Sequence, residues 1–315
     1  MSSIIVIKGM LMSDKIKIAA VVGPTAGGKT ALAIELAKRL DGEIICCDSM
    51  QIYERMMIGS AAPTEEEKQG IPHHLFGFVP IEKNFSAADY VPLARQKIEE
   101  ITARGKLPIL CGGTGLYLES LLYQSDYSPS VDPEIREDLN KKDGDELYEM
   151  LKELDPESAV SIHKNNKKRV VRALEITIGT GRKKSEWDAL TRVKEPLYDA
   201  RVAVLSYRGR ETLYDRINRR VDLMLEAGLL DEVKSIDFPE GSTAGEAIGY
   251  KELRGYLNGE ATLEEASEDI KQATRRYAKR QITWFKREKN ALLLYVEDYD
   301  SSEDIVNKVL NYLTS

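Results

Sequence analysis

The sequence predicts an α/β fold in which a parallel β-sheet is flanked by helices, with an inserted, mainly helical subdomain. Two observations predict the sheet: short apolar runs alternate with amphipathic helical segments, and a glycine-rich loop joins the first run to the first helix. A polar, charged stretch with helical periodicity in the middle of the chain predicts the insertion. We therefore expect a core over residues 14–125 and 199–315 and an inserted subdomain over residues 126–198.

The first part of the core alternates between predicted strands and predicted helices. Short apolar runs that indicate buried strands cover residues 17–22, 43–47 and 107–111. The first helix carries Leu32, Leu36 and Leu40 at spacings of four, and a second helix is expected over residues 87–104. Strands and helices in this order are typical of a parallel sheet with crossover helices.

The rest of the chain extends this plan. Residues 132–187 are polar and helical in period, and Asp155-Pro156 marks a helix start within them. The strand pattern returns at residues 201–207 and again at residues 291–296. Helices are expected between these two strands, over residues 210–227 and 263–286.

The composition is that of a folded, soluble protein. Of the 315 residues, 42% are apolar, which is enough to form a core, and 31% are charged. The apolar run at residues 4–7 is too short to span a bilayer, and no secretory signal pattern is present, so we expect a cytoplasmic protein with residues 1–13 as an extension. The net charge of −7 alone argues against a nucleic-acid partner, although local basic clusters matter more than the total.

Neither the cysteines nor the histidines suggest a metal site. Cys46, Cys47 and Cys111 lie inside predicted strands without metal-ligand spacing, and we expect buried thiols without a chemical role. His73 and His74 form a pair with no partner at a spacing suited to zinc, so we expect a structural role for them in their loop.

The glycine-rich loop is a complete phosphate-binding motif. Gly23-Pro24-Thr25-Ala26-Gly27-Gly28-Lys29-Thr30 fits G-x-x-x-x-G-K-[S/T] between a strand and a helix, which predicts a P-loop NTPase-like sheet. Backbone N–H groups and the helix N-terminus of such a loop face phosphate oxygens. Lys29 is expected to neutralise phosphate charge, and the hydroxyl of Thr30 is expected to bind Mg²⁺. The alternative, a glycine-rich turn without a ligand, is disfavoured by the complete motif.

An acidic residue follows the second apolar run instead of the third. The run at residues 107–111 ends in Gly112-Gly113-Thr114, without the carboxylate that nucleotide-hydrolysing P-loop proteins normally carry, whereas Asp48 follows the run at residues 43–47. Both strand ends are expected near the phosphate site, because ligands bind at the carboxyl ends of parallel strands. Asp48 is therefore a candidate general base, with a helix N-cap or an outer-shell Mg²⁺ ligand as the alternatives.

The phosphate loop is one of several sequence blocks that occur in a characteristic order. The next blocks are Asp48-Ser49-Met50-Gln51-Ile52-Tyr53, Pro72-His73-His74-Leu75 and Gly112-Gly113-Thr114-Gly115-Leu116-Tyr117, followed by Ile162-His163 with Asn165-Asn166 and by residues 169–175, 247–252 and 278–285. Over about residues 17–297 the chain closely resembles the tRNA dimethylallyltransferase family, also called tRNA isopentenyltransferases. One departure is Gly27, where the family commonly has Ser, although a backbone N–H at that position can still face phosphate.

The resemblance implies transfer of a dimethylallyl group from dimethylallyl diphosphate to N6 of the adenosine on the 3′ side of the anticodon of a tRNA. The phosphate loop would hold a diphosphate leaving group, with Mg²⁺ as the cofactor. By resemblance Arg220 would also reach the diphosphate; the alternative for this residue is a solvated helix face. Asp48 would take a proton from the adenine amine, and Thr114 would orient that amine.

The resemblance also implies the residues that meet the tRNA, whose target base must leave its stack to react. The flipped base would contact Asp48, Ser49, Met50, Gln51 and Thr114, and the tRNA backbone would contact Arg136, Lys168, Arg169 and Arg172. The implied partners are the anticodon stem-loop of tRNA and dimethylallyl diphosphate. No membrane partner is expected, and the protein is expected to be a monomer.

Basic segments agree with an RNA partner. Residues 271–287 contain seven Lys or Arg and no acidic residue, and residues 163–172 contain five more without an acid. Lys271, Arg275 and Lys279 are spaced to share one helix face, and Lys279 with Arg280 are the candidate tRNA contacts of this segment. The alternative for each segment is a solvated basic helix face.

Three other functions stay open from the sequence. A small-molecule kinase would share the phosphate loop and the sheet but would have no use for the basic segments. An isopentenyltransferase that acts on free adenine nucleotides would share the chemistry, and the basic segments argue against it. A non-catalytic RNA-binding module with a nucleotide switch would not require Asp48 beside a complete phosphate loop.

Overall fold

The computed structural model describes residues 15–123, 131–190, 195–288 and 290–315. The chain forms two compact units. The first, which we call the core unit, comprises Met1–Leu122 and Pro196–Ser315, and the second, the helical unit, comprises Tyr123–Glu195. The sequence pattern had placed the borders of the insertion at residues 126 and 198.

The core unit is built around a parallel sheet, which confirms the predicted α/β class. In the described residues the sheet has six strands in the order β3-β2-β4-β1-β5-β6, and every neighbouring pair is parallel. The strands are β1 (Lys17–Val22), β2 (Gly42–Cys46), β3 (His73–His74), β4 (Leu107–Gly112), β5 (Asp199–Ser206) and β6 (Leu292–Tyr295). The sequence pattern missed β3, because two residues are too few to show an alternating pattern.

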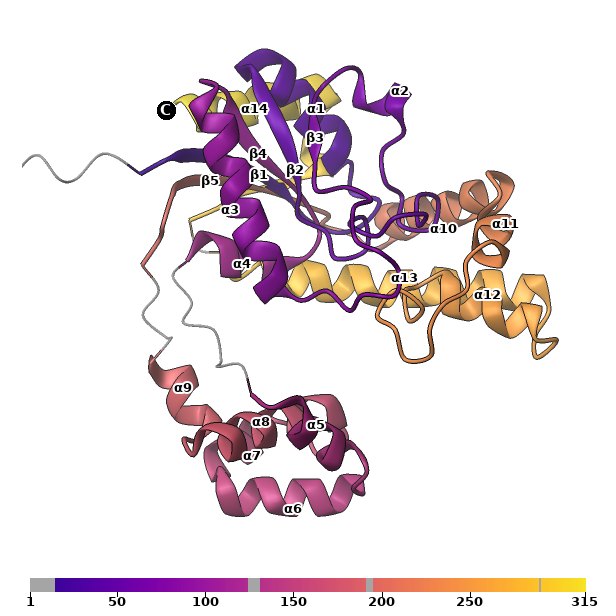
Figure 1. Cartoon of the computed structure of the whole chain (residues 1–315). Coiled ribbons are helices and arrows are strands. Elements are labelled where there is room, and N and C mark those ends of the chain that lie inside the picture. Colours follow the sequence, from indigo (N-terminus) through magenta and orange to yellow (C-terminus); the bar gives the residue numbers. More distant parts are fainter. Residues whose placement is uncertain (1–14, 124–130, 191–194, 289) are drawn as a thin grey trace, which may run out of the picture. The chain divides into compact units, whose positions relative to one another are not determined.

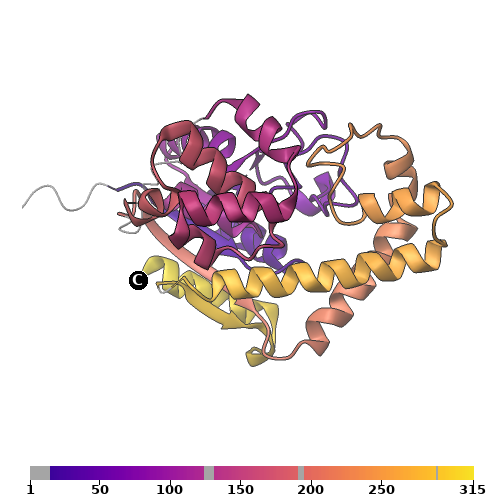
Figure 2. The same ribbon diagram turned by 90° about the horizontal axis from the view of Figure 1, so that it is seen from below.

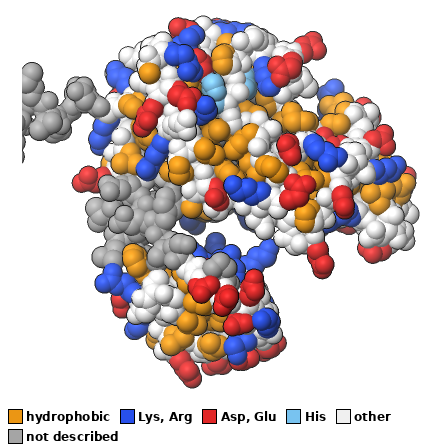
Figure 3. All heavy atoms as spheres, viewed as in Figure 1, with side chains coloured by type: hydrophobic (Ala, Val, Ile, Leu, Met, Phe, Trp, Pro, Cys, Tyr) orange, Lys and Arg blue, Asp and Glu red, His pale blue; other side chains and the backbone are white. Residues whose placement is uncertain are grey.

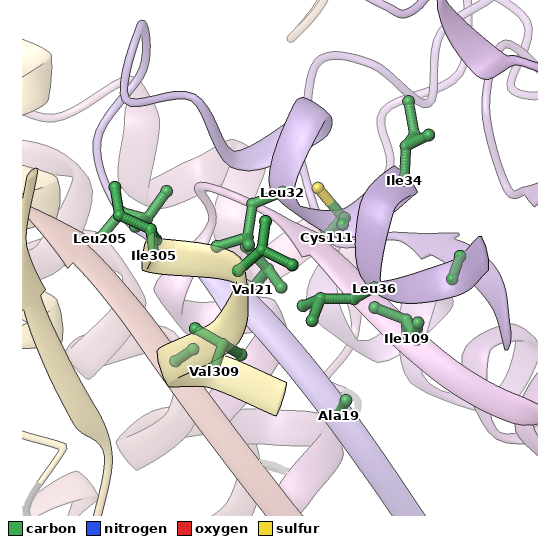
Figure 4. Packing of buried hydrophobic residues seen from close by; sticks show 14 of the residues in the cluster. Ala19, Val21, Leu32, Ile34, Leu36, Ile109, Cys111, Leu205, Ile305 and Val309 are labelled. Atoms are coloured by element: carbon green, nitrogen blue, oxygen red, sulfur yellow. The ribbon is translucent and has the colours of Figure 1, made fainter. Parts of the chain in front are cut away.

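Helices cover both faces of this sheet (Figure 1). On one face lie α1 (Lys29–Leu40) and α14 (Ser302–Thr314), and on the other lies α3 (Ala87–Ala103). Figure 4 shows Val21 of β1 surrounded by Leu32, Leu36 and Val309, so the predicted leucine face of α1 meets the sheet. The helix α14 was not predicted, although its apolar residues close this part of the core.

Further helices of the core unit connect or follow these strands along the chain. They are α2 (Glu65–Lys68), α4 (Gly115–Leu122), α10 (Glu211–Glu226), α11 (Leu229–Lys234), α12 (Tyr250–Leu257), α13 (Leu263–Phe285) and the short 3₁₀ turn η1 (Val296–Asp298). Figure 2 shows α13 as one long helix, and it packs against α10, α12 and α4. The C-terminal part of α13 meets the residues that follow β4.

The helical unit consists of five described helices. They are α5 (Pro133–Asn140), α6 (Gly144–Leu154), α7 (Pro156–Ser161), α8 (Lys167–Thr180) and α9 (Lys184–Leu190). The predicted helix start at Asp155 is confirmed, because this side chain caps α7 by accepting a hydrogen bond from the backbone N–H of Ser158. The chain leaves and re-enters the core unit at adjacent points, since the N–H of Leu197 donates to the carbonyl oxygen of Leu122 at 2.8 Å.

Charge is mixed over the surface. On the face of the core unit shown in Figure 3, basic and acidic side chains are interspersed, so the net charge of −7 does not form one acidic surface there.

None of the helices in the described ranges has the length and hydropathy needed to cross a bilayer.

Candidate active site

The carboxyl ends of β1, β2 and β4 open into a cavity of about 630 Å³ within the core unit. Several segments far apart in the sequence form its walls. The phosphate loop contributes residues from Thr25 to Thr30, the turn after β2 contributes Asp48 to Gln51, α10 contributes Arg216 and Arg220, and α13 contributes Tyr277 and Arg280. The sheet topology places these segments together, as expected for a parallel sheet whose ligand site lies at the carboxyl ends of the strands.

The backbone of the phosphate loop leaves the start of α1 open. Gly28, with a φ of 89°, precedes the helix and provides no side-chain cap, so the first N–H groups of α1 are available to an anion. Gly23 has a φ of 145°, and a Cβ there would lie 2.4 Å from the carbonyl oxygen of Leu205 on β5. Glycine at residue 23 therefore lets the loop leave β1 close against its neighbouring strand.

Two N–H groups of the loop already have partners within the protein. Thr25 donates to Oε1 of Gln281 at 2.8 Å, and Gly27 donates to the carbonyl oxygen of Pro24 at 3.2 Å. The sequence motif suggested that the loop amides as a group would face phosphate. In this structure these two instead hold the loop in shape, and the N–H groups at the start of α1 have no side-chain cap.

Three cationic side chains gather at this end of the cavity. Lys29 donates from Nζ to the carbonyl oxygen of Pro24 at 2.8 Å, and Arg216 donates from Nε to that of Ala26 at 2.8 Å. Burial lowers the pKa of Lys29, whereas the nearby Asp48 acts in the opposite direction. Burial and then the charge of Arg216 lower the pKa of Arg220. Such crowded positive charge favours an anionic ligand.

The position of Arg220 does not fit a solvated helix face. Its side chain lines the cavity, whereas the neighbouring Arg219 is exposed and fits the solvated helix face. Sequence reasoning missed Arg216, which also lines the cavity. The signal was present, because Arg216 lies four residues before Arg220 and residues at this spacing share one face of a helix.

Asp48 lines the same cavity as the three cations. Its Oδ1 accepts a hydrogen bond from the N–H of Met50 at 2.9 Å. Turns rather than a helix follow Asp48, so the interpretation of this residue as a helix N-cap is wrong. A carboxylate held at the cavity wall is suited to accept a proton from a bound substrate.

Thr114 lies beside Ser49 and does not line the cavity. Its Oγ1 accepts from the N–H of Ser49 at 2.9 Å and donates to Oγ of Ser49 at 3.2 Å. Ser49, Met50 and Gln51, by contrast, all line the cavity. In this structure Thr114 therefore fixes Ser49 and is not part of the cavity wall.

The glycines after β4 allow α13 to approach closely. A Cβ on Gly113 would lie 2.1 Å from Nε2 of Gln281, and one on Gly115 would lie 2.2 Å from Cδ1 of Trp284. Gln281 is only 4% exposed, and its Nε2 donates to the carbonyl oxygen of Gly113 at 3.0 Å while its Oε1 accepts from Thr25. Gln281 thus ties the phosphate loop to the end of β4, a role that nothing in its sequence position indicated.

The basic segment on α13 is not one continuous RNA-facing surface. Lys271 pairs with Asp222 of α10 at 2.6 Å, and Arg275 bonds Asn218 of α10 and Glu268, each at 2.7 Å. The prediction that this helix face is open to phosphates is therefore wrong for Lys271 and Arg275, because α10 packs against it. Further along the helix, Lys279 is exposed, and Arg280 lines the cavity with its guanidinium 5.4 Å from the ring centroid of Tyr277.

The helical unit carries the other predicted tRNA contacts. Lys168 and Arg169 are exposed in the first turn of α8. Arg136 and Arg172 both pair with the buried carboxylate of Glu175, at 2.7 and 2.8 Å. This carboxylate fixes the two guanidinium groups near each other, which suits a partner with negative charge.

The cysteines and histidines lie in structural positions. Cys46, Cys47 and Cys111 are buried and free, as predicted. Burial raises the pKa of Cys47 to about 12 and that of Cys111 to about 11, so both thiols stay protonated near neutral pH. His74 bonds the buried Glu43 at 2.7 Å through Nε2, which fastens β3 to β2.

Comparison with known proteins identifies the family. The IPP transferase family model matches residues 51–288, which is most of the chain. A tRNA dimethylallyltransferase of Acetivibrio thermocellus is 46% identical over 303 residues, which cover 94% of this chain and 96% of the relative. The chain belongs to the tRNA dimethylallyltransferase family. The matched family region begins at Gln51, so the phosphate loop and Asp48 precede it, whereas the alignment with this relative extends over nearly the whole chain.

Other members of the family support the same assignment. A tRNA dimethylallyltransferase of Bacillus licheniformis is 50% identical over 274 residues, covering 85% of this chain and 87% of the relative. The crystal structure of a tRNA isopentenylpyrophosphate transferase from Bacillus halodurans has a TM-score of 0.71 and 42% identity, covering 95% of this chain and 97% of that one. A eukaryotic dimethylallyltransferase described as acting on tRNA has a TM-score of 0.81 and 31% identity, covering 95% and 79%.

Proposed function

We propose that this protein transfers a dimethylallyl group from dimethylallyl diphosphate to N6 of the adenosine on the 3′ side of the anticodon of a tRNA, acting as a monomer in the cytoplasm. One observation carries the proposal: a single cavity combines a cluster of cations, suited to a diphosphate leaving group, with a carboxylate suited to act as a base. The names of the relatives support tRNA as the acceptor.

The donor diphosphate would bind at the phosphate loop. The first N–H groups of α1 and the side chains of Lys29, Arg216 and Arg220 offer it hydrogen bonds and positive charge. These groups act most strongly on the departing diphosphate, whose charge develops as the allylic bond breaks. Such stabilisation is usually the largest contribution to catalysis in sites of this kind.

Mg²⁺ is the cofactor that this site would take. Within the described residues, no three or more His, Cys, Asp or Glu side chains gather in a group that could hold a metal. Mg²⁺ suits such a place, since it commonly binds through one or two protein oxygens together with substrate phosphates and water. The hydroxyl of Thr30, which lines the cavity beside Lys29, would hold it, and the ion would neutralise charge on the diphosphate.

Asp48 would act on the acceptor. The amine lone pair of adenine is delocalised into the ring, so the amine reacts poorly unless it loses a proton as the new C–N bond forms. In the proposed step the allylic C–O bond breaks, its electron pair leaves with the diphosphate, N6 bonds to the allylic carbon, and Asp48 takes the N6 proton. General base catalysis of this type contributes about 10²–10⁴-fold.

The tRNA would present a base that has left its stack, as substrates of base-modifying enzymes do. Ser49, Met50 and Gln51 line the cavity beside Asp48 and would contact this base. Lys279, Arg280 and, from the helical unit, the exposed Lys168 and Arg169 would contact phosphates. Arg136 and Arg172, held by Glu175, would serve in the same way.

A direct assay tests donor, acceptor and reaction together. The protein is incubated with Mg²⁺, dimethylallyl diphosphate and an unmodified tRNA whose anticodon is followed by adenosine, with AMP and Asp48→Asn as parallel controls. The nucleosides are then analysed by mass spectrometry. We expect a dimethylallyl mass gain on adenosine in the tRNA sample alone and a strongly reduced gain with the variant.

Other outcomes of the assay would replace the proposal. A gain on AMP would indicate the isopentenyltransferase that acts on free nucleotides. No gain on either acceptor would reject prenyl transfer, and release of phosphate from ATP with a small metabolite would then indicate a kinase.

A further inference from the structure

The carboxylate of Glu232, on α11, accepts four hydrogen bonds although it does not line the cavity. Its Oε2 accepts from the backbone N–H groups of Met57 (2.9 Å) and Ile58 (2.8 Å). Its Oε1 accepts from the N–H of Gly59 (3.0 Å) and from the hydroxyl of Tyr250 (2.6 Å). A carboxylate has about four lone-pair positions, so this one is fully engaged. Three consecutive N–H groups thus converge on one side chain.

The segment that Glu232 holds, residues 57–61, forms part of the cavity wall. Gly59, Ser60 and Ala61 line the cavity. The side chain of Gln51 donates from Nε2 to the carbonyl oxygens of Ser60 (3.2 Å) and Ala61 (2.8 Å). A continuous series of hydrogen bonds therefore runs from Glu232 through this segment to Gln51, three residues after Asp48.

Tyr250 and Gly59 complete the arrangement. A Cβ on Gly59 would lie only 2.5 Å from the Tyr250 ring, so the ring packs directly against the backbone of the segment. Tyr250 is fully buried. Burial, followed by the neighbouring Glu232, raises the pKa of its hydroxyl, which therefore stays protonated and donates to the carboxylate. Ring and carboxylate together hold Gly59 from two sides.

We propose that Glu232 is a positioning residue that keeps residues 57–61, and through them Gln51, in the arrangement that receives the tRNA base. The inference rests on the proposed function, because the acceptor role of Asp48 to Gln51 belongs to it. Glu232 contacts neither substrate. Its effect is confined to the acceptor side of the cavity, since the phosphate loop and α10 share none of its hydrogen bonds.

The variant Glu232→Gln separates this role from simple packing. The amide has nearly the same shape as the carboxylate, but only one of its two oxygen positions can still accept. In one orientation of the amide, the N–H groups of Met57 and Ile58 would face its NH₂ group, donor against donor. In the other orientation the N–H of Gly59 would do so, while the hydroxyl of Tyr250 turns to accept. Displacement of a substrate-contacting segment by about 1 Å can lower the rate about 10²-fold, so we expect kcat/KM for tRNA to fall about 10- to 100-fold.

The matched control is Asp231→Asn. Asp231 is the exposed neighbour on the same helix and loses the same charge, but among the described residues its carboxylate pairs only with Lys234, at 3.7 Å. We expect this variant to keep the kinetic constants of the unmodified protein. Tyr250→Phe removes one of the four hydrogen bonds and should give a smaller loss in the same direction as Glu232→Gln.

Two further measurements, which need no turnover, accompany the kinetics. Hydrogen exchange of the backbone amides of Met57, Ile58 and Gly59 should accelerate in Glu232→Gln and stay unchanged in Asp231→Asn. Binding of inorganic diphosphate, measured by calorimetry, should be unchanged in both variants, because the donor side of the cavity is not affected. A raised KM for tRNA without a change for the donor completes the expected pattern.

Three results would overturn the proposal. The first is that Glu232→Gln has the same kcat/KM for tRNA as Asp231→Asn. The second is that Glu232→Gln weakens diphosphate binding as much as it lowers kcat/KM for tRNA. The third is that its loss of activity is fully explained by a smaller fraction of folded protein. Failure of the unmodified protein to prenylate tRNA would instead refute the proposed function, and normal prenylation by Glu232→Gln would refute the positioning role alone.

Discussion

The two ends of the cavity are built in different ways. At the donor end, the phosphate loop is one run of eight residues, and two arginines four positions apart on α10 join it. At the acceptor end, Asp48 to Gln51 depend on side chains from distant segments: Thr114 bonds Ser49, and Glu232 holds the segment that Gln51 bonds. The donor end is therefore built on one local backbone motif, which Gln281 and Arg216 secure from two helices, whereas the acceptor end has no such motif and depends on contacts across the fold.

This difference has a consequence for specificity. A diphosphate is small and highly charged, so several cations at the start of a helix are enough to bind it. A flipped base must be oriented to within a fraction of an ångström for the amine to react. We expect substitutions at the donor end to act mainly on donor binding and on the departure of the diphosphate, and substitutions at the acceptor end to act on tRNA use alone.

The largest effect is expected at Asp48. Asp48→Asn keeps an oxygen that can accept from the N–H of Met50 but removes the base. Turnover should fall about 10²–10⁴-fold, while the affinity for tRNA, measured by filter binding, stays nearly unchanged. Unchanged turnover would exclude Asp48 as the base, and loss of tRNA affinity would show that the acceptor end depends on its charge.

Arg220→Ala should have the next largest effect, and on the donor side. It removes a cation from the cavity wall, and loss of one stabilising group of this kind commonly costs about 10²–10³-fold in turnover. The matched control is Arg219→Ala, an exposed arginine on the same helix. Steady-state kinetics at varied donor concentration should show a large loss for Arg220→Ala and none for Arg219→Ala. Equal losses in the two variants would contradict the placement of the diphosphate.

Gln281→Ala tests the connection between the two ends. The change leaves the N–H of Thr25 and the buried carbonyl oxygen of Gly113 without their partner, which costs about 1–3 kcal/mol of stability for each buried group. Thermal unfolding should show this loss, and the KM for both substrates should rise. A change in the KM for tRNA alone would mean that the phosphate loop keeps its shape without Gln281.

The smallest effect is expected from the paired substitution of Lys279 and Arg280 by Ala. Each removed phosphate contact should reduce the slope of the logarithm of tRNA affinity against the logarithm of salt concentration by about 1. Lys271→Ala is the control, because Lys271 pairs with Asp222 and should not contribute to the slope. If the salt dependence of tRNA affinity has the same slope in the two variants, Lys279 and Arg280 do not contact the tRNA.

Much of the donor end and of the sheet was predictable from the sequence. The phosphate loop, the strand runs and the apolar spacing on α1 are patterns among residues close together in the chain, and the strands they predicted agree with the structure to within two residues. Asp48 could be placed for the same reason, since it directly follows a strand whose direction was known. The substrates were predicted from the sequence motifs that the chain shares with its family, because no local pattern determines them.

The sequence by itself thus determined the fold class, the position of the glycine-rich loop and the acid beside it. Only the tertiary structure decided that Lys271 and Arg275 face α10 and that Gly113 and Gly115 make room for Gln281 and Trp284. The same holds for Glu232, whose three backbone partners lie 173 to 175 residues away, and for Gln281, which bonds Thr25 across 256 residues. Local patterns arise from neighbours along the chain, whereas partners at such separations exist only once the helices have packed.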